Sequence, residues 1–377
     1  MFKKPVYFLL VFIYLLGGCS GGIMGHTDRL ISSNSPVDYA EIPGSEPTAT
    51  AHPGNEALDR LTGDQVATLT SLQKVDEFPL YSMSFVGQYD EAHSTMDAGA
   101  VLLPQDAIPS YSDWGCSLFT SLVDSENLLF GRNFDWRYSP ALLLFTDPPD
   151  GYASFSMVDI AYLVDDEVVD RLEELPINER EVLLQTPYWP FDGMNEHGLA
   201  IGMAAVDNSP MPHDPQKETI DSLMIIREML DHARDVGEAL EIMKRYNISW
   251  EGGPALHYLL ADPSGQALLV EFVDGEMRVL PNHQPWHLAT NFLLSMDPNN
   301  KQANCWRYEI IEDTLVEFNG KLTAKQAIDL LGEVSWESAT HATQWSIVYD
   351  MNSAEAHVAV GRNYERTHSF SMKDSGQ

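Results

Sequence analysis

Cysteine is scarce in this sequence, and the pattern of the few cysteines excludes two kinds of protein. The 377 residues include only Cys19, Cys116 and Cys305. Three cysteines are too few for a disulfide scaffold, so burial of apolar groups must stabilise the fold. No Cys-x-x-Cys spacing is present, and we therefore expect neither a metal site nor another cofactor.

Basic residues are also few: 22 Lys and Arg stand against 56 Asp and Glu, which gives a formal net charge of −34. Nucleic acid would be repelled at long range, so we expect no nucleic-acid partner. High solubility explains this charge, and a preference for cationic substrates is the alternative. Because 44% of the residues are hydrophobic, the chain can still bury a large core.

The N-terminus lacks an apolar run long enough to cross a membrane. Lys3 and Lys4 precede an apolar run of about a dozen residues, whereas a spanning helix needs about 20. The run ends in Leu16-Gly17-Gly18-Cys19, which resembles the bacterial lipobox. We therefore predict a lipoprotein signal peptide over residues 1–18, lipidation of Cys19 and anchoring to a membrane of the bacterial cell envelope, outside the cytoplasm. An ordinary secretory signal with an incidental cysteine is the alternative.

The rest of the chain divides by composition. Residues 19–54 are rich in Gly, Ser, Pro and Thr and have few large apolar groups, so we predict a flexible tether. Residues 55–115 contain a helical pattern over 58–72 and a strand over 79–86. Residues 116–377 hold most of the periodic segments and no internal repeat. We therefore expect ordered structure from residue 55 onward.

Apolar periodicity predicts a β-rich chain interrupted by two helix pairs. Candidate strands are 98–103, 141–145, 154–164, 199–206, 255–261, 266–273, 277–280, 287–292, 344–349 and 356–360. Candidate helices are 220–233, 235–246, 302–318 and 323–334, with capping boxes at Asp235 and Thr323. This order predicts an α+β fold, in which antiparallel sheets carry helices on their outer faces.

One predicted β-hairpin carries a combination of residues that suggests catalysis. Cys116 begins its first apolar run, residues 124–127 form the turn, and the second run, 128–136, contains Arg132 and Asp135. A hairpin folds the end of its second strand beside the start of its first, so the thiol, guanidinium and carboxylate would meet. These groups are the minimum set for an activated cysteine nucleophile. A buried core thiol is the alternative.

The same residues resemble a known family. Gly115-Cys116-Ser117 followed by Gly131-Arg132-Asn133-Phe134-Asp135-Trp136 is similar to the choloylglycine hydrolase family of N-terminal-nucleophile (Ntn) hydrolases. That family includes bile-salt hydrolases, penicillin V acylases, acid ceramidase and N-acylethanolamine acid amidase. Further similar motifs follow in order: Asn-Glu-x-Gly-Leu within 193–199, Thr-Asn at 290–291, Arg307 and the closing strand at 344–346.

The resemblance implies both a fold and a processing step. The implied fold is a four-layer αββα sandwich of antiparallel sheets flanked by helices. The long segment before Cys116 favours the acid-ceramidase-like branch, whose precursor is cut into two chains. Residues 55–115 would then be a propeptide-like α-chain and residues 116–377 the catalytic domain. Because Cys116 is internal, the chain would first have to cleave its own Gly115–Cys116 bond.

The resemblance also implies roles for the site residues. Cys116 would supply the nucleophilic thiol and, once freed, an α-amine with a pKa of about 7.7–8.0 that can take the thiol proton. Arg132 would favour the thiolate, and Asp135 would hold the α-ammonium. Asn291 would offer its NH₂ group to the tetrahedral oxyanion.

Two positions keep alternatives open. Arg307 would orient Asp135 or bind a substrate carboxylate. Ala205 stands where bile-salt hydrolases carry a further Asn, so that contact must be absent or supplied by another group. An Ntn cysteine needs no histidine, so three histidines are expected to be structural: His197, His257 and His287.

The predicted function is therefore a lipid-anchored, self-processing amidase that hydrolyses linear, non-peptide C–N bonds of N-acylated small molecules. Acyl transfer to an amine through the same acyl-cysteine is one alternative, and a binding lipoprotein whose Cys116 stays internal is another. The sequence predicts neither the acyl group nor the oligomeric state. Cys305 is expected to be a free helix thiol. Some apolar residues could line an acyl pocket or pack in the core: Phe134, Trp136, 142–145 and Trp189.

Overall fold

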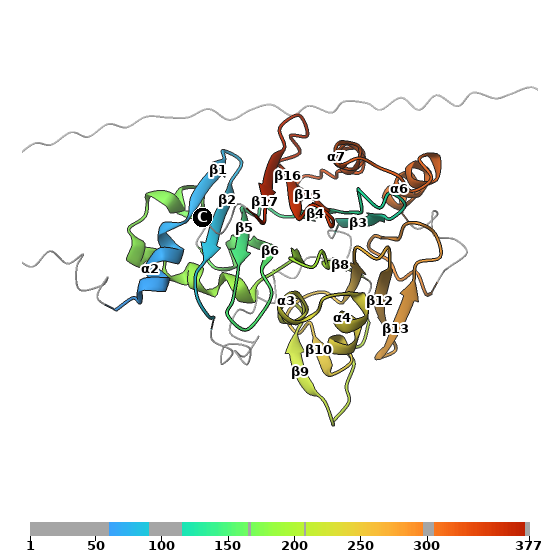
Figure 1. Ribbon diagram of the computed structural model, residues 1–377, viewed down its shortest axis with the longest axis horizontal. Coiled ribbons are helices and arrows are strands. Elements are labelled where there is room, and N and C mark those ends of the chain that lie inside the picture. The colour runs from blue at the N-terminus through green and yellow to red at the C-terminus, as the bar shows by residue number, and fades with distance from the viewer. Residues whose placement is uncertain (1–59, 90–114, 165–166, 207–208, 297–304, 374–377) are drawn as a thin grey trace, which may run out of the picture. The chain divides into compact units, whose positions relative to one another are not determined.

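Two β-sheets pack face to face, and helices cover the outer face of each (Figure 1). The computed structural model describes residues 60–89, 115–164, 167–206, 209–296 and 305–373, which belong to one compact unit, His52–Gln377. The order of the layers is helix, sheet, sheet, helix. The predicted four-layer αββα fold is therefore confirmed.

The larger sheet has nine described strands, and neighbouring strands are antiparallel except for the parallel pair β2 and β5. Their spatial order is β1 (Gln73–Asp76), β2 (Leu80–Phe85), β5 (Ala141–Thr146), β6 (Ser154–Asp159), β7 (Asp192–Asn195), β8 (Ala200–Ala205), β11 (Leu256–Ala261), β12 (Ala267–Val273) and β13 (Glu276–Pro281).

The smaller sheet has six described strands, all antiparallel to their neighbours. Their spatial order is β14 (Leu288–Ala289), β3 (Gly115–Ser121), β4 (Leu129–Trp136), β15 (Ala342–Asp350), β16 (Glu355–Val360) and β17 (His368–Ser371). A separate parallel pair consists of β9 (Glu218–Asp221) and β10 (Tyr246–Ser249).

The helices lie where the predicted pairs placed them. Near the larger sheet are α3 (Met224–His232) and α4 (Val236–Met243), and above the smaller sheet are α6 (Trp306–Glu317) and α7 (Ala324–Glu333) (Figure 1). The predicted capping box of α7 is confirmed, because Thr323 and Gln326 each accept the other's backbone N–H. Further helices are α2 (Gly63–Thr70) and the 3₁₀ helices η5 (Ile160–Tyr162), η6 (Val169–Glu174), η7 (Ile177–Glu179) and η8 (Glu181–Tyr188).

The two sheets approach each other closely at Gly202 on β8. A Cβ atom at this position would lie 2.5 Å from Cδ2 of Leu118 on β3, which is closer than two carbons can pack. Strands β3 and β4 are buried along their whole length, because β8 covers one face and the helices cover the other. This double cover explains why their sequences read as nearly continuous apolar runs.

The motif Asn-Glu-x-Gly-Leu forms the turn between β7 and β8. The Asn195 side chain accepts the N–H groups of His197 and Leu199 and donates to the carbonyls of Leu230 and Ala233 beside α3. Its amide therefore joins the turn to the helix layer, and the role of this Asn is structural.

Several predicted elements were wrong in their limits. The strand predicted over 154–164 ends at Asp159, whose side chain accepts the N–H of Ala161 and starts η5. The helix predicted over 220–233 begins only at Met224 because residues 218–221 pair with β10. The strand predicted over 287–292 is reduced to β14, because pairing with β3 ends at Ala289.

The capping box predicted at Asp235 forms only in part. Asp235 accepts the N–H of Glu238 as expected. The Glu238 carboxylate instead accepts the backbone N–H and the guanidinium of Arg234. Glu238 therefore pairs with Arg234 and does not accept the backbone N–H of Asp235, as a complete capping box would require.

The segment upstream of Cys116 contributes to the larger sheet. Strand β2 pairs in parallel with β5, and β1 forms the sheet edge beyond it. The Tyr81 hydroxyl donates to the carbonyl of Val169. Asp76 forms an ion pair with Arg366 and a hydrogen bond with Nε2 of His368, near the end of the chain. The strands of this segment are thus an integral part of the larger sheet.

Several predictions lie outside the described residues: the signal peptide over 1–18, the tether over 19–54, lipidation of Cys19 and the strand over 98–103. In the part of the chain that the structure does describe, no helix is both long and apolar enough to cross a bilayer.

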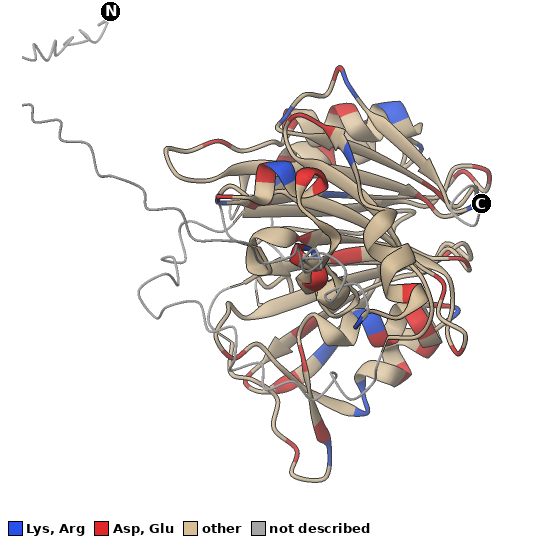
Figure 2. Cartoon of the chain, turned by 90° about the vertical axis from the view of Figure 1, so that its left-hand side faces the viewer, with Lys and Arg blue, Asp and Glu red and all other residues tan. Residues whose placement is uncertain are grey.

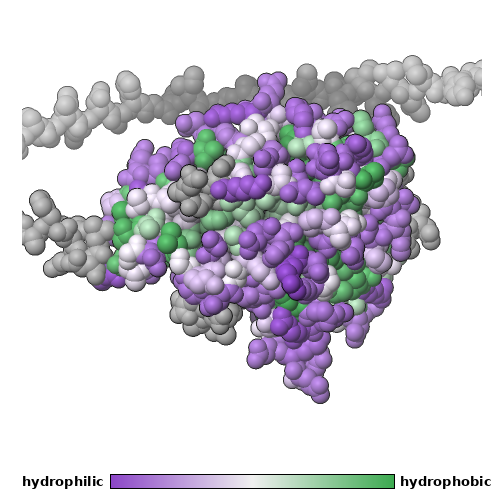
Figure 3. Space-filling model, viewed as in Figure 1, coloured by the Kyte–Doolittle hydropathy of each residue, from purple (hydrophilic) through white to green (hydrophobic). Residues whose placement is uncertain are grey.

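The described surface is acidic and mostly hydrophilic. Figure 2 shows Asp and Glu spread over helices and loops on both sides of the sandwich, with fewer Lys and Arg. In Figure 3 the visible face is mainly hydrophilic, and its hydrophobic areas are separated by polar ones. A dispersed charge of one sign favours solubility, in line with the first of the two interpretations of the net charge.

Candidate active site

The predicted hairpin forms, and its register decides which side chains share a face. Strands β3 and β4 pair with Gly115 opposite Asp135 and Cys116 opposite Phe134. Side chains alternate along a strand, so Cys116, Phe134 and Arg132 face the space between the sheets. Asp135 points to the other face, toward the helices. The structure therefore brings the predicted guanidinium to the face of the thiol and places the carboxylate behind it.

Arg132 is held by the opposite sheet. Its Nη1 atom lies 2.5 Å from Oδ2 of Asp192 on β7 and 2.5 Å from the carbonyl oxygen of Phe191. The side chain is 0% exposed, and its carbon Cζ lies 5.1 Å from the centre of the Phe134 ring. Its Nε and Nη2 atoms have no hydrogen-bond partner among the described residues. This buried cation can therefore still bind a neighbouring anion.

Asp192 is a site residue that sequence reasoning missed. It is fully buried, and it accepts hydrogen bonds from the Tyr349 hydroxyl at 2.6 Å and from Nε1 of Trp345 at 3.4 Å. The signal was an acidic residue directly after the apolar Phe191. Residues 192–195 form β7.

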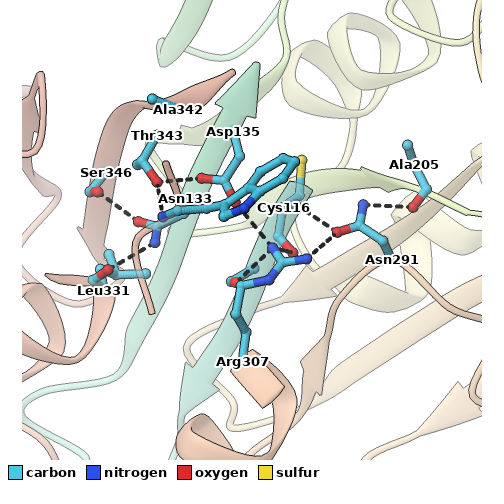
Figure 4. Close-up of polar contacts among 12 residues, drawn as sticks. Cys116, Asn133, Asp135, Ala205, Asn291, Arg307, Leu331, Ala342, Thr343 and Ser346 are labelled. Carbon is cyan, nitrogen blue, oxygen red and sulfur yellow. Dashed lines mark hydrogen bonds and ion pairs between the residues drawn. The ribbon is translucent and has the colours of Figure 1, made fainter. Parts of the chain in front are cut away.

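The backbone of Cys116 is held by side chains (Figure 4). Oδ1 of Asn291 accepts the Cys116 N–H at 2.7 Å, and Nη1 of Arg307 donates to the Cys116 carbonyl oxygen at 2.8 Å. Strand β14 pairs with β3 only as far as Ala289. Beyond that point the Asn291 side chain takes the place of a strand backbone, which explains why the predicted strand over 287–292 is short.

Arg307 connects this backbone contact to Asp135 (Figure 4). Its Nη1 atom lies 3.0 Å from Oδ2 of Asp135, and its Nη2 atom donates to Oδ1 of Asn291 at 2.8 Å. The Thr343 hydroxyl donates to Oδ1 of Asp135 at 2.5 Å. Of the two roles left open for Arg307, the first matches this arrangement, because the guanidinium is paired with Asp135.

The Asn291 amide is oriented by Ala205, the residue that stands where bile-salt hydrolases carry an Asn. Its Nδ2 atom donates to the backbone carbonyl of Ala205 at 2.8 Å. This contact uses one of the two N–H bonds of the NH₂ group. At position 205 the main chain therefore orients the Asn291 amide.

Burial controls the ionisation of both acidic groups in the intact chain. Burial raises the pKa of the Cys116 thiol above its usual value, and Arg132 opposes the rise. Burial also raises the pKa of Asp135 to about 6, against the opposing effect of Arg307. The thiol is therefore protonated at neutral pH before cleavage.

Gly115 is enclosed by its neighbours. A Cβ atom here would lie 2.6 Å from Cε3 of Trp336 and 2.8 Å from Oδ2 of Asp135. Both distances are shorter than packed atoms allow. A residue without a side chain is therefore required at the first position of β3.

Gly115→Ala is expected to destabilise the intact chain by about 1–3 kcal/mol, because the added methyl group must displace the Trp336 ring or the Asp135 carboxylate. Urea unfolding monitored by tryptophan fluorescence measures the change. Gly63→Ala is the matched control, since nothing lies within 4 Å of a Cβ atom there. Equal unfolding midpoints for the two variants would contradict the steric argument.

The remaining candidates lie in the fold as follows. His257 is buried opposite Glu271, with Nδ1 at 3.5 Å from Oε1, and His197 contacts the Tyr152 ring. The described chain contains no group of three or more His, Cys, Asp or Glu side chains that could hold a metal ion. Cys305 is a free, half-buried thiol directly before α6. The residues considered for an acyl pocket belong to the packed core, except Trp189, which is partly buried: Phe134, Trp136 and 142–145.

Comparison with solved structures identifies the fold. A variant of conjugated bile acid hydrolase from Clostridium perfringens superposes with a TM-score of 0.53 and 15% sequence identity, over 69% of this chain and 93% of the other. The chain has the Ntn-hydrolase fold. Penicillin V acylase from Agrobacterium tumefaciens gives a TM-score of 0.49 at 15% identity, over 68% of this chain and 86% of that one. An N-acylethanolamine-hydrolyzing acid amidase orthologue from Caenorhabditis elegans gives a TM-score of 0.42 at 12% sequence identity, over 63% of this chain and 93% of that one.

The sequence comparison agrees with this Ntn-hydrolase fold. Residues 190–365 match the model of the family described as acyl-coenzyme A:6-aminopenicillanic acid acyl-transferase. The matched region includes Asn291 and Arg307 and begins after the hairpin that carries Cys116. No curated protein matches the chain. The resemblance to the choloylglycine hydrolase family of Ntn hydrolases, drawn from the motifs, is confirmed.

Proposed function

We propose that this protein is a self-processing amidase that uses Cys116 as an N-terminal nucleophile and hydrolyses linear, non-peptide C–N bonds of N-acylated small molecules. One observation carries the proposal: a side chain holds the backbone nitrogen of Cys116, and the buried guanidinium of Arg132 shares the face of its thiol. Asn291 accepts the Cys116 N–H at 2.7 Å. After cleavage the same Asn291 side chain would lie beside the α-amine of Cys116, the group through which an N-terminal nucleophile works.

The first step is cleavage of the chain itself. The Cys116 sulfur adds to the Gly115 carbonyl, the C–N bond breaks, and the nitrogen takes up the thiol proton, which leaves a thioester. Water then hydrolyses the thioester, giving a carboxylate on Gly115 and a free thiol and α-amine on Cys116. Because Gly115 has no side chain, no Cβ atom hinders the approach of the sulfur to its carbonyl carbon.

Amide hydrolysis follows the same chemistry with an external substrate. The α-amine of Cys116 takes the proton from the thiol, and the thiolate attacks the acyl carbon. Arg132 stabilises the thiolate, and Asp135, oriented by Arg307 and Thr343, binds the α-ammonium. The amine leaves with a proton, and water releases the acid from the acyl-cysteine.

The relatives support the substrate class. The proteins superposed above include a conjugated bile acid hydrolase, whose name describes hydrolysis of a conjugated small molecule. Acyl transfer is the second candidate, because the matching family model is described as an acyl-transferase. In that reaction an amine replaces water as the acceptor of the acyl group.

The proposed location is the bacterial cell envelope. The support is the sequence pattern at the N-terminus, in which Lys3 and Lys4, a short apolar run and Leu16-Gly17-Gly18-Cys19 follow one another. A lipid on Cys19 would anchor the protein to a membrane without spanning it.

A two-part experiment tests the proposal. Intact-mass spectrometry of the purified protein is expected to show two chains that meet between Gly115 and Cys116. The processed protein is then expected to release free amine from at least one member of a panel of N-acyl amides with aliphatic, aromatic and steroidal acyl groups. A chain that stays intact from acidic to neutral pH and releases no amine would refute the amidase. Acyl exchange with added free amines would favour transfer.

A further inference from the structure

Two acidic groups that come from different sheets interact with Arg132. Asp192 of β7 is 2.5 Å from Nη1. The thiol of Cys116 lies on the same face of the β3–β4 hairpin as Arg132, and the charge of Arg132 acts on it. Arg132 and Asp192 are 0% exposed and Cys116 is 6% exposed, so water screens none of these charges effectively.

A buried guanidinium needs one negative partner, and two acidic neighbours compete for that position. Asp192 is well equipped to hold the negative charge, because Tyr349 and Trp345 both donate hydrogen bonds to its carboxylate. While Asp192 is ionised, its charge offsets that of Arg132. The sulfur then gains less from Arg132 than it would from an unpaired guanidinium.

We propose that Asp192 is a positioning residue that shares the charge of Arg132 with the Cys116 sulfur and so sets the pH at which the thiol ionises. This inference rests on the proposed function in that the ionised thiol is the nucleophile. It extends the site to a strand of the opposite sheet.

Other charged or titratable groups also face the Cys116 thiol and Asp192, and a test of Asp192 must leave them unchanged. Asp135 on β4 and Arg307 on α6 also affect the Cys116 thiol, with opposite signs. Tyr349 on β15 is the other titratable group that faces Asp192. Burial raises the pKa of Asp192 above its usual value, and Arg132 opposes the rise. A substitution at Asp192 leaves all of these groups in place.

Asp192→Asn would remove the charge of Asp192 while Arg132 keeps its position. The same Nη1 atom also donates to the Phe191 carbonyl at 2.5 Å, and the guanidinium is enclosed beside the Phe134 ring. Asn has the shape of Asp and can still accept from Nη1. The Arg132 charge would then be unbalanced until the thiol ionises, so the thiolate should form at lower pH.

The test measures the rate at which iodoacetamide alkylates Cys116 from about pH 5 to about pH 10, with peptide mass spectrometry to separate Cys116 from the other thiols. Asp192→Asn is expected to lower the midpoint of this profile by about one pH unit or more. A folded variant whose midpoint is unchanged or higher would overturn the inference. If Asp192→Asn does not fold, Asp192→Ser is the second neutral variant and has the same expected direction.

Asp231→Asn is the matched control. Asp231 is another buried aspartate paired with an arginine, at 3.1 Å from Nε of Arg227, and it lies on α3 outside the groups that affect Cys116. The control should lose stability but keep the wild-type midpoint. Equal shifts in both variants would show a general effect of breaking a buried ion pair. Alkylation does not require amide hydrolysis or cleavage, so a failure of the amidase proposal leaves this readout intact.

Discussion

Cys116→Ala is expected to remain a single chain and to lose amide hydrolysis by at least about 10⁴-fold. The variant removes the only atom that the proposed mechanism uses to attack both the Gly115 carbonyl and the substrate. Asn291, Arg307 and Asp135 would remain in place, but they have no nucleophile to assist. Intact mass and amine release, measured on the same preparation, check the two halves of the prediction.

Cys305→Ala is the control for this experiment. It removes the other described thiol, which is half-buried directly before α6 and forms no disulfide, so cleavage and hydrolysis should both be retained. A Cys116→Ala chain that splits at the wild-type rate would show that another protease makes the cut. A variant that stays whole but still hydrolyses amides would place the nucleophile elsewhere.

Asp135→Asn is expected to separate stability from activity. Hydrolysis should fall by about 10²–10⁴-fold, because a neutral amide no longer holds the α-ammonium of Cys116 in position for proton transfer. Stability above pH 6 should be unchanged or higher. The reason is that burial disfavours the ionised carboxylate of Asp135, with a pKa of about 6, and Asn resembles the protonated form.

The sign of the pH dependence follows from this raised pKa. The folded chain binds the Asp135 proton more tightly than the unfolded chain, where the pKa is near 3.8. The stabilisation is therefore complete below about pH 4 and is lost as the pH rises through about 6, by roughly 3 kcal/mol in total. Urea unfolding between these pH values should show this loss in Cys116→Ala and a smaller loss in Cys116→Ala/Asp135→Asn. Parallel profiles would contradict it.

The sequence predicted the layers because the relevant signals are local. Apolar runs separated by turns such as 262–265 set the strands, and caps such as Thr323 set the helices. The 3₁₀ helices η6 to η8 were not predicted, since they have no regular apolar period and include Pro187. Strands β9 and β10 were missed because their pairing is parallel and joins distant segments.

At the site, the sequence indicated candidate residues but not their contacts. The apolar runs on either side of the turn 124–127 predicted the hairpin that Cys116 and Arg132 share, whereas the face of Asp135 depends on the register. The choice between the two roles of Arg307 required tertiary structure, because α6 is far from β4 in the sequence. Asp192 escaped notice because Asp-Gly is more typical of a turn than of a buried strand.

The strand β2 has a consequence for the reversibility of unfolding. If the chain is cut at Gly115–Cys116, β1 and β2 belong to a different polypeptide from β5, yet they share a sheet with it. Dilution would not separate the two pieces while the sheet stays intact. Once unfolded, however, they would have to find each other in solution, so renaturation becomes a second-order reaction. The stability of the cut protein would therefore depend on protein concentration, whereas that of the intact chain would not.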